Sequence, residues 1–384
     1  METAKRIYLP PVSLVGPGAL EELKSDLQQS DYKKILFVTD AVLRKIGVAK
    51  KVEDLLTACK LDYVVYDEVK QNPTVANVEK GLEIYQQNSC DCIITLGGGS
   101  PQDCGKAIAI LATNGGKIQQ YEGIHKSKKK SAPLIAINTT AGTASEITIN
   151  YVITDEERKI KMVMVDKNSL VDIAVNDPVL MVNMPASLTA ATGMDALTHA
   201  IEAYVTAGAF NWSDNIALHA IKLISANLRD AVNDGKNMEA RNNMAWGQFI
   251  AGQAFSNCGL GYVHSMAHQL GGFYDLPHGV CNAILLPHVE KFNAPACGDK
   301  FRDIAEAMEI DTTGMSTEEA NDAAIEAIKN LSKAVGIPSG LKDLGVKEED
   351  FKVMAENALV DACAGGNPRQ VSLEETIELY SAAM

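Results

Sequence analysis

The sequence predicts an α/β N-terminal domain with a parallel sheet, followed by an all-α C-terminal domain. From about residue 34, short β-branched runs alternate with helical stretches, as in a parallel sheet covered by helices. From about Pro185 the chain is rich in Ala, Leu, Met, Glu and Lys with helical periodicity. A chain of 384 residues also exceeds the size at which one hydrophobic core keeps growing. We therefore expect two domains, 1–184 and 185–384.

Composition narrows the class of protein. Acidic residues exceed basic residues by 49 − 35 = 14, which argues against nucleic acid or an anionic membrane as a partner. No basic start leads into an apolar run, and no apolar stretch reaches ~18 residues, so neither a signal peptide nor a membrane span is predicted. The eight cysteines include no Cys-x-x-Cys, which fits reduced thiols better than disulfides. A cytoplasmic protein is expected.

The predicted strands are short apolar runs separated by turn residues and helical stretches. A further strand-like run stands at the start of the chain, residues 6–9, and could pair with a partner's sheet edge. The other predicted strands are residues 34–38, 61–66, 92–96, 133–137, 150–154, 160–165 and 171–175.

A glycine-rich loop follows the strand at residues 92–96. The run Gly97-Gly98-Gly99-Ser100-Pro101 leads into a helix start, where backbone N–H groups and the positive helix terminus favour a phosphate. We expect a pyrophosphate there. The usual dinucleotide fingerprint is absent because Gln102 stands at the third glycine position, and Lys106 lies too far on for a Walker loop. A plain tight turn is the alternative.

Other candidate cofactor contacts lie on neighbouring strands and loops. Asp40 ends the first strand, where it could accept a hydrogen bond from a ribose hydroxyl and repel a 2′-phosphate, or simply cap a helix. The run from Asn138 to Thr148 is rich in small hydroxylated residues and could form a second cradle or a polar loop. Lys161 could reach a phosphate, or protect a sheet edge.

Two helical segments present metal-ligand residues at four-residue spacing. His264 and His268 share one helix face, and the pair Gly271-Gly272 is expected to break that helix so that His278 returns toward them. Asp195 and His199 have the same spacing. One Asp with up to three His suits Fe(II), Zn(II) or a similar ion. Histidines with only a structural role are the alternative. His125, His219 and His288 have no such spacing, and we interpret them as surface or structural residues.

The segments that hold these residues lack cations. No Lys or Arg occurs between Pro185 and Ile221, or between Trp246 and Glu290. A site for a carboxylate or phosphate substrate normally supplies a cation. The expected substrate is therefore small and uncharged.

Several motifs together resemble the iron-dependent alcohol dehydrogenases (group III) over essentially the whole chain. Within that family they are most similar to those of the lactaldehyde reductases, also called propanediol oxidoreductases, while propanediol, ethanol and methanol dehydrogenases share most of them. The motifs are Gly97-Gly-Gly-Ser-Pro-Gln-Asp103, Thr139-Thr-Ala-Gly-Thr-Ala-Ser-Glu146, Thr148-Ile-Asn-Tyr-Val-Ile-Thr-Asp155, Ala191-Thr-Gly-Met-Asp-Ala-Leu-Thr-His-Ala-Ile-Glu202 and Gly365-Gly-Asn-Pro-Arg369.

The resemblance implies a role for each matching residue. It makes His268 the residue near the nicotinamide that moves the proton, rather than a ligand. It makes Cys363 part of the substrate pocket, and this thiol is either oxidation-sensitive or inert. The implied metal ligands are Asp195, His199, His264 and His278; the implied cofactor contacts are Asp40, Gly97, Gly98, Ser100, Asp103, Thr139, Thr140, Thr143 and Lys161; and the implied pocket residues are Asn150, Phe255 and Cys363.

The activity implied is that of an NAD-linked, metal-dependent alcohol dehydrogenase acting on a small neutral aldehyde or alcohol. Fe(II) is the expected metal and Zn(II) the alternative. A homodimer or higher homo-oligomer is expected by analogy. The competing hypotheses are a zinc polyol dehydrogenase of the glycerol type and a non-catalytic metal-binding protein. A dehydroquinate synthase is disfavoured because cations are missing around the metal residues.

Overall fold

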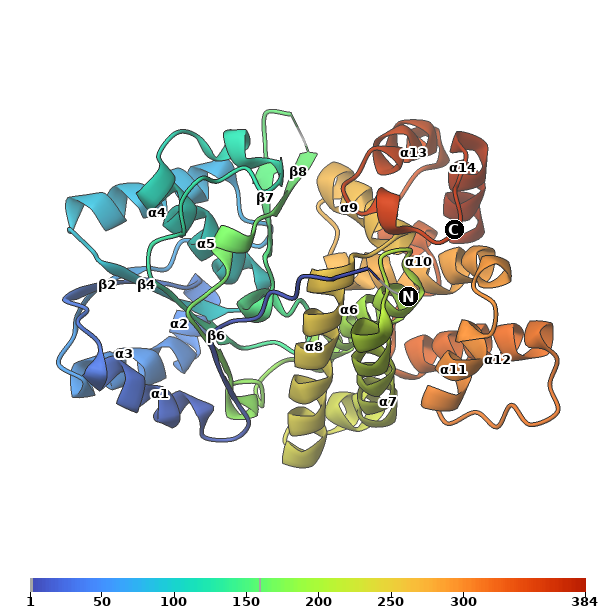
Figure 1. Ribbon diagram of the computed structural model, residues 1–384, viewed down its shortest axis with the longest axis horizontal. Helices are drawn as coiled ribbons and strands as arrows, with labels where there is room; N and C mark the ends of the chain where they lie inside the picture. Colours follow the sequence, from blue (N-terminus) through green and yellow to red (C-terminus); the bar gives the residue numbers. More distant parts are fainter. Residues whose placement is uncertain (1–2, 159) are drawn as a thin grey trace. The chain divides into compact units, whose positions relative to one another are not determined.

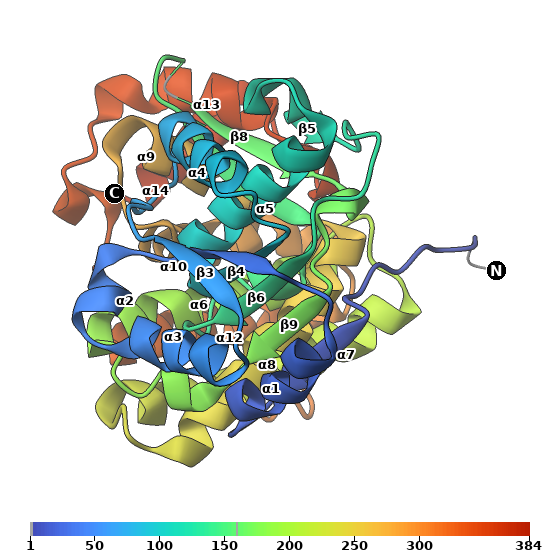
Figure 2. The same ribbon diagram turned by 90° about the vertical axis from the view of Figure 1, so that its left-hand side faces the viewer.

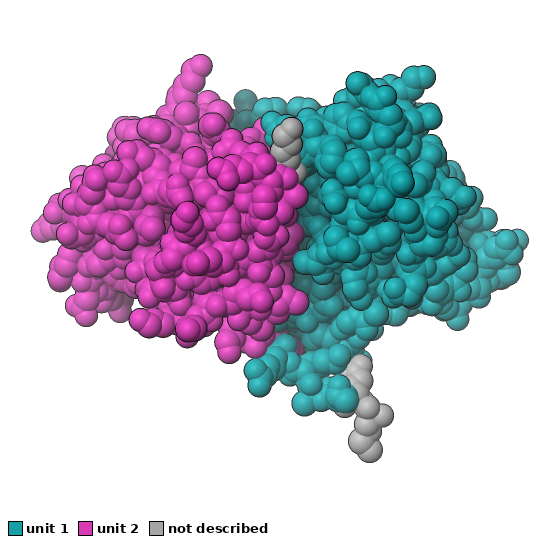
Figure 3. All heavy atoms as spheres, turned by 90° about the horizontal axis from the view of Figure 1, so that it is seen from above, with its two compact units in different colours: residues 1–6, 141–143, 183–384 teal, residues 7–140, 144–182 magenta. Residues whose placement is uncertain are grey.

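The computed structural model describes residues 3–158 and 160–384 and divides into two compact units. Among the described residues, one unit comprises residues 7–140 and 144–182, and the other comprises residues 183–384, 141–143 and 3–6 (Figure 3). The first holds a parallel sheet with helices and the second is helical, which confirms the predicted fold class. We call them the sheet unit and the helical unit.

The sheet unit is built on six parallel strands (Figure 2). Its central strand β4 is buried at every position, as expected for a parallel strand covered on both faces. Gly97 at the end of β4 pairs with Asn138, which pairs in turn with Asn176. The last residues of these three strands therefore lie side by side at the carboxyl end of the sheet. The strand order is β1 (Val12–Val15), β9 (Ile173–Asn176), β6 (Leu134–Asn138), β4 (Cys92–Gly97), β2 (Lys34–Val38) and β3 (Asp62–Tyr66).

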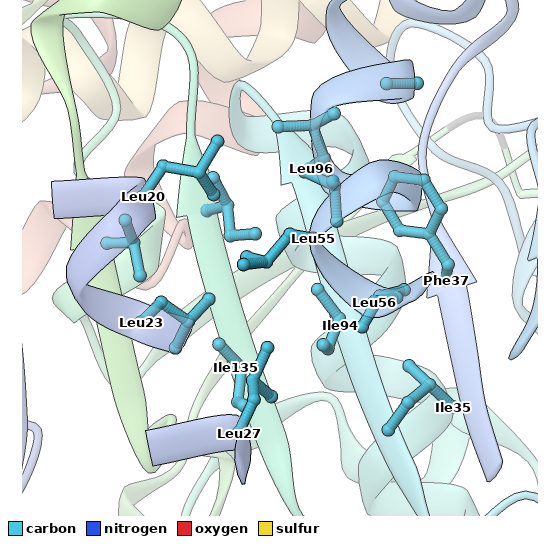
Figure 4. Close-up of a cluster of buried hydrophobic side chains, with 14 of the residues drawn as sticks. Leu20, Leu23, Leu27, Ile35, Phe37, Leu55, Leu56, Ile94, Leu96 and Ile135 are labelled. Carbon is cyan, nitrogen blue, oxygen red and sulfur yellow. The ribbon is translucent and has the colours of Figure 1, made fainter. Parts of the chain in front are cut away.

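Helices cover both faces of this sheet. Helices α1 (Ala19–Gln29) and α3 (Val48–Ala58) lie on one side, while α4 (Val75–Gln87) and α5 (Gly99–Asn114) lie on the other (Figure 1). The apolar faces of α1 and α3 pack on strand side chains such as Ile94 and Ile135, which are fully buried (Figure 4). This rigid core fixes where the loop after β4 begins.

A second, smaller sheet joins β5 (Gly123–Ile124), β8 (Ile160–Val165) and β7 (Asn150–Asp155). Strands β7 and β8 form an antiparallel pair, whereas β9 belongs to the main sheet. Residues 6–9 form no strand, and the first strand is Val12–Val15, at an edge of the main sheet. The prediction of a strand at residues 6–9 was therefore wrong, since the first strand begins at Val12.

The helical unit is organised around α6 (Ala186–Val205), which is buried along most of its length. Small residues let its neighbours approach closely: a Cβ on Gly193 would lie 2.2 Å from Leu228 Cδ1. None of the described helices is both long and apolar enough to span a membrane. The other helices are α7 (Asn211–Asn233), α8 (Met238–Cys258), α9 (Tyr262–Tyr274), α10 (His278–Asn293), α11 (Lys300–Ala307), α12 (Thr317–Ala334), α13 (Phe351–Leu359) and α14 (Leu373–Ala382).

Helix α9 continues through Gly271 and Gly272 and ends at Tyr274; the next residue, Asp275, has a left-handed backbone with φ 52°. The prediction that the glycine pair breaks this helix was therefore wrong. An internal glycine weakens a helix by about 1 kcal/mol, which the burial of α9 can offset. The turn at Asp275 and Pro277 then starts α10 at His278.

Candidate metal and cofactor sites

Three helices of the helical unit bring together the residues predicted as metal ligands. Helix α6 carries Asp195 and His199 one turn apart, α9 carries His264, and α10 begins with His278. Ligand atoms of Asp195, His199 and His264 lie within 4.8 Å of one another. The ring centroids of His264 and His278 are 5.3 Å apart. The sequence thus places these four side chains in one cluster.

The amide nitrogen of Asn282 marks the point where three of these side chains converge. It lies 2.7 Å from Asp195 Oδ1 and 3.1 Å from Nε2 of both His264 and His278. An amide nitrogen carries two hydrogens and only donates, so its two hydrogens are shared among three acceptor atoms. The lone pairs of these three atoms therefore converge on one point, where a cation could bind them. The reverse amide orientation would set an oxygen against the Asp195 carboxylate. A divalent cation therefore fits this donor set of nitrogen and carboxylate atoms.

Burial keeps two of the imidazoles neutral. Desolvation lowers the pKa of His199 to about 3, although the Asp195 carboxylate opposes the shift. Desolvation also lowers the pKa of His264, and His268 adds to the effect. A metal binds only the neutral imidazole, so these shifts prepare both side chains as ligands.

Glu202, one turn after His199 on α6, fixes the ring of His264. Its carboxyl group hydrogen-bonds His264 Nδ1 and accepts the Val263 amide at 2.8 Å. Burial raises the pKa of Glu202 to about 8, although hydrogen bonds from backbone amides at the start of α9 oppose this rise. His264 Nε2 faces the donor on Asn282 and therefore acts as an acceptor. The proton shared between Glu202 and His264 consequently lies on Nδ1 of His264. The arrangement matches the carboxylate–histidine–metal pattern of many metalloproteins.

Two glycines permit these close approaches. A Cβ on Gly279 would lie 2.3 Å from the Ala191 carbonyl oxygen, so only glycine lets the start of α10 touch α6. A Cβ on Gly261 would lie 2.9 Å from Asn367 Oδ1, which accepts the Tyr262 amide at 3.2 Å. The motif at residues 365–369 therefore anchors the start of α9.

His268 points to a different partner, although it shares a helix with His264. Its Nδ1 lies 3.0 Å from Asp361 Oδ2, and its ring stacks on His278 with centroids 5.4 Å apart. Burial alone would raise the pKa of Asp361. The electrostatic effect of His268, together with hydrogen bonds from His268 and Cys363, outweighs burial, so the pKa of Asp361 is lowered. The ionised carboxylate accepts a hydrogen bond from Nδ1–H, which leaves the lone pair of His268 on Nε2.

The candidate pocket residues divide between the units. Phe255 stacks on His199 with centroids 4.2 Å apart, so it walls the metal cluster. Cys363 donates its backbone amide to Asp361 Oδ1 at 2.9 Å. Asn150 lies at the start of β7 in the sheet unit, where its carbonyl accepts from buried Lys106 at 2.7 Å.

The glycine loop of the sheet unit leads straight into α5. Gly97 has φ 154°, and a Cβ on Gly98 would lie 3.0 Å from Thr140 Cγ2, so both positions need a bare backbone. Gln102 donates to the carbonyls of Gly97 and Ile137 at 3.2 and 2.9 Å. The residue that replaces the third glycine of the usual fingerprint therefore ties the loop to two strands. Ser100 lies in the first turn of α5, partly exposed.

The remaining cofactor candidates have structural contacts. Asp40 caps α2 (Ala41–Lys45) by accepting the Leu43 amide at 2.8 Å. Lys161 on β8 donates to Asn72 at 2.8 Å. Asp103 accepts from Ser145 at 2.6 Å and from the Val152 amide at 3.0 Å, while burial raises its pKa. Of the hydroxylated run, Thr139 and Thr140 follow β6 in the sheet unit and Thr143 belongs to the helical unit.

Sequence reasoning missed three residues of the site. Glu202 continues the helical stripe of Asp195 and His199, and Asn282 lies one turn after His278, so both could have been found from spacing. Asp361 could not have been found from helical spacing, because it lies 93 residues away from His268 in the sequence.

Comparison with known proteins places the whole chain in one family. The model of the iron-containing alcohol dehydrogenases matches residues 10–178, and the model of the C-terminal domain of the Fe-containing alcohol dehydrogenase family matches residues 189–384. The chain is 48% identical to lactaldehyde reductase of Escherichia coli (strain K12), over 99% of this chain and 100% of that protein. It is 44% identical to the NAD-dependent methanol dehydrogenase of Bacillus methanolicus, over 98% and 99%.

A crystal structure of 1,3-propanediol oxidoreductase has the same fold. It superposes with a TM-score of 0.97 at 48% identity, and the match covers 100% of both chains.

Proposed function

This chain belongs to the family of iron-containing alcohol dehydrogenases, and on that premise we propose that it interconverts lactaldehyde and 1,2-propanediol with NAD(H). Its similarity to a lactaldehyde reductase over essentially its full length supports this substrate pair. Similar identities to a 1,3-propanediol oxidoreductase and a methanol dehydrogenase keep 1,3-propanediol, ethanol and methanol as alternative substrates. The missing cations near the metal residues favour a neutral substrate in every case.

The observation that carries the proposal is the convergence of Asp195, His264 and His278 on the Asn282 amide nitrogen. Together with His199, these residues are the proposed ligands of one divalent cation, Fe(II). When bound, such a cation supplies Lewis acidity toward an alcohol or carbonyl oxygen, while NAD supplies the hydride carrier.

The protein's own groups orient these ligands and keep them dry. Glu202 holds His264 Nδ1, so that Nε2 faces the other ligands. Phe255 covers His199 by stacking and excludes water from that side. A dry surrounding strengthens every electrostatic interaction in the site.

His268 is the proposed proton carrier. Asp361 holds its Nδ1–H, so Nε2 can accept the alcohol proton and return it in the reverse reaction. Stacking on His278 keeps the ring next to the ligand cluster.

The glycine loop and the start of α5 are the proposed pyrophosphate site. Gly97, Gly98 and Ser100 would contact the phosphates, with Asp103, Thr139, Thr140, Thr143 and Lys161 as further cofactor contacts. Asp40 would select NAD over NADP by repelling a 2′-phosphate. Support comes from the bare backbone at Gly97 and Gly98 ahead of a helix of sixteen residues.

NADH oxidation by metal-stripped protein tests the function. The protein, purified without oxygen, is reloaded separately with Fe(II) and Zn(II) and assayed with lactaldehyde, propanal and dihydroxyacetone. Fast turnover with Fe(II) and lactaldehyde is expected. Activity only with Zn(II) and dihydroxyacetone would move the protein to the zinc polyol dehydrogenases, and NADH binding without turnover of any aldehyde would favour a non-catalytic metal-binding protein.

We also propose a homo-oligomer in the cytoplasm. The edge strand β1 has an unpaired side within the described sheet and could extend the sheet of a second copy. The eight cysteines are present as thiols rather than disulfides, which supports a reducing compartment. Sedimentation analysis would measure the oligomeric state.

A further inference from the structure

A second group of metal-binding side chains lies next to the proposed ligand cluster. It consists of His268, Asp361 and Cys363, which we call the thiol cluster. One ligand atom from each of these residues lies within 4.8 Å of the other two. Among the described residues, only this group and the one with Asp195 have this property.

The carboxylate of Asp361 organises the thiol cluster. One of its oxygens faces His268 Nδ1 at 3.0 Å, and the other accepts the Cys363 amide at 2.9 Å. The side chains of His268 and Asp361 are only 8% and 6% exposed, whereas Cys363 is partly exposed. Two ligands are therefore held in place, and a cation could arrive past the third.

The donor atoms decide which cations would bind. The thiol cluster offers one nitrogen, one oxygen and one sulfur, which suits borderline and soft ions such as Zn(II) and Cd(II). The neighbouring set of Asp195 and three histidines offers no sulfur. We propose that the thiol cluster is a second, inhibitory cation site that takes thiophilic divalent ions while the first site keeps its iron.

Binding at this site changes the protons on its ligands in a defined way. The Cys363 thiol releases its proton to solvent as the sulfur–metal bond forms. His268 gives Nδ1 to the cation, and its ring proton moves to Nε2. Nε2 then carries a hydrogen and can no longer accept one from an alcohol. The loss of turnover rests on the proposed role of His268, whereas binding itself does not.

Cadmium titration of the iron-loaded protein tests the site. Cd(II) is added anaerobically while thiolate-to-cadmium absorption in the ultraviolet, bound iron and NADH oxidation are followed together. We expect the absorption to saturate at one equivalent, iron to remain bound, and turnover to fall in step with the absorption. The absorption excludes binding at the first set, because that set holds no sulfur.

Variants assign the absorption to its residues. Cys363→Ser should abolish it, and Asp361→Asn should weaken cadmium affinity at least tenfold while leaving the absorption at saturation. Cys297→Ser removes a partly exposed thiol from the same unit as a matched control and should leave the titration unchanged.

Three results would overturn the proposal. The first is an absorption that persists in Cys363→Ser, and the second is cadmium uptake only as iron leaves, which would be exchange at the first site. The third is the absence of any thiolate absorption in the unaltered protein. Saturation with unchanged turnover would establish the site, overturn its inhibitory effect and contradict the proposed role of His268.

Discussion

The two units build their candidate sites from different parts of the chain. In the sheet unit, the loop after β4 presents backbone, because a side chain at Gly98 would strike Thr140. In the helical unit, the ligand cluster is made of side chains from three helices, of which Asp195, His199 and His264 are buried and His278 is partly exposed. The candidate site in the sheet unit therefore depends on positions without side chains. The candidate site in the helical unit depends on polar and ionisable side chains, which the surrounding protein must stabilise in place of water.

The difference extends to electrostatics. Burial lowers the pKa of His199 and raises that of Glu202, so in the helical unit desolvation shifts the pKa of both groups against the charged form. The loop and the first turn of α5 up to Pro101 hold no ionisable side chain. We therefore expect substitutions in the ligand cluster to act through metal binding and pH, and those at the loop to act through cofactor affinity.

Removing a ligand should have the largest effect. For His278→Ala we expect loss of bound metal and a fall in turnover of roughly 10³-fold, because Lewis-acid stabilisation supplies several kcal/mol. Metal analysis and NADH oxidation measure the two effects. The exposed His219→Ala is the matched control and should change neither. Full metal content in His278→Ala would remove it from the ligand set.

Stability should depend on pH through Glu290. Burial raises the pKa of this carboxyl to about 8, with the nearby Glu202 adding to the shift. An acid with a raised folded-state pKa holds its proton more tightly when folded, so its contribution to stability falls as the pH rises from 4.5 to about 8.

Glu290→Gln keeps a neutral side chain of the same shape. Relative to the unaltered metal-stripped protein, the variant should gain little at pH 5 and on the order of 2 kcal/mol at pH 8. Denaturant unfolding at both pH values measures the difference. An equal effect at both would show that Glu290 titrates alike in the folded and unfolded chains.

Adding a methyl group to the loop should weaken cofactor binding. The Cβ of Gly98→Ala would lie 3.0 Å from Thr140 Cγ2, so one of them must shift. We expect a roughly tenfold rise in the dissociation constant of NADH, about 1.4 kcal/mol, with bound metal unchanged. Gly365→Ala is the control, since a Cβ there meets no atom within 4 Å. Unchanged NADH affinity would argue against the phosphate site.

The smallest effect is expected at Asp40. Asp40→Gly removes a helix cap and the charge that would repel a 2′-phosphate, and a glycine cap costs only a few tenths of a kcal/mol. We expect a gain in NADPH use of a few fold. Thr74→Gly removes a comparable cap from α4 and should not alter cofactor preference. An unchanged preference in Asp40→Gly would leave this residue as a cap alone.

Local pattern predicted much of the fold and the cluster. Apolar runs located the strands of the main sheet, and four-residue spacing paired Asp195 with His199. Spacing alone groups His268 with His264 as a ligand, whereas in the structure its Nδ1 lies at hydrogen-bond distance from Asp361, a carboxylate far along the chain. The family resemblance, and not the spacing, separated His268 from His264.

Long-range pairing was beyond the pattern. Strands β7 and β8 resemble the others in sequence, yet they form their own sheet, because sheet membership depends on partners distant in the chain. Likewise, the glycine pair in α9 signalled a break that tertiary packing prevents. Intrinsic propensities are worth about 1 kcal/mol and are overridden by burial.

We propose that His264 binds the metal and that His268, one turn along the same helix, does not. The most direct test compares the metal content of His264→Ala and His268→Ala after identical anaerobic loading with Fe(II). We expect loss of iron from His264→Ala, and near-complete iron with depressed turnover in His268→Ala. Iron retained by His264→Ala, or lost from His268→Ala, would contradict it.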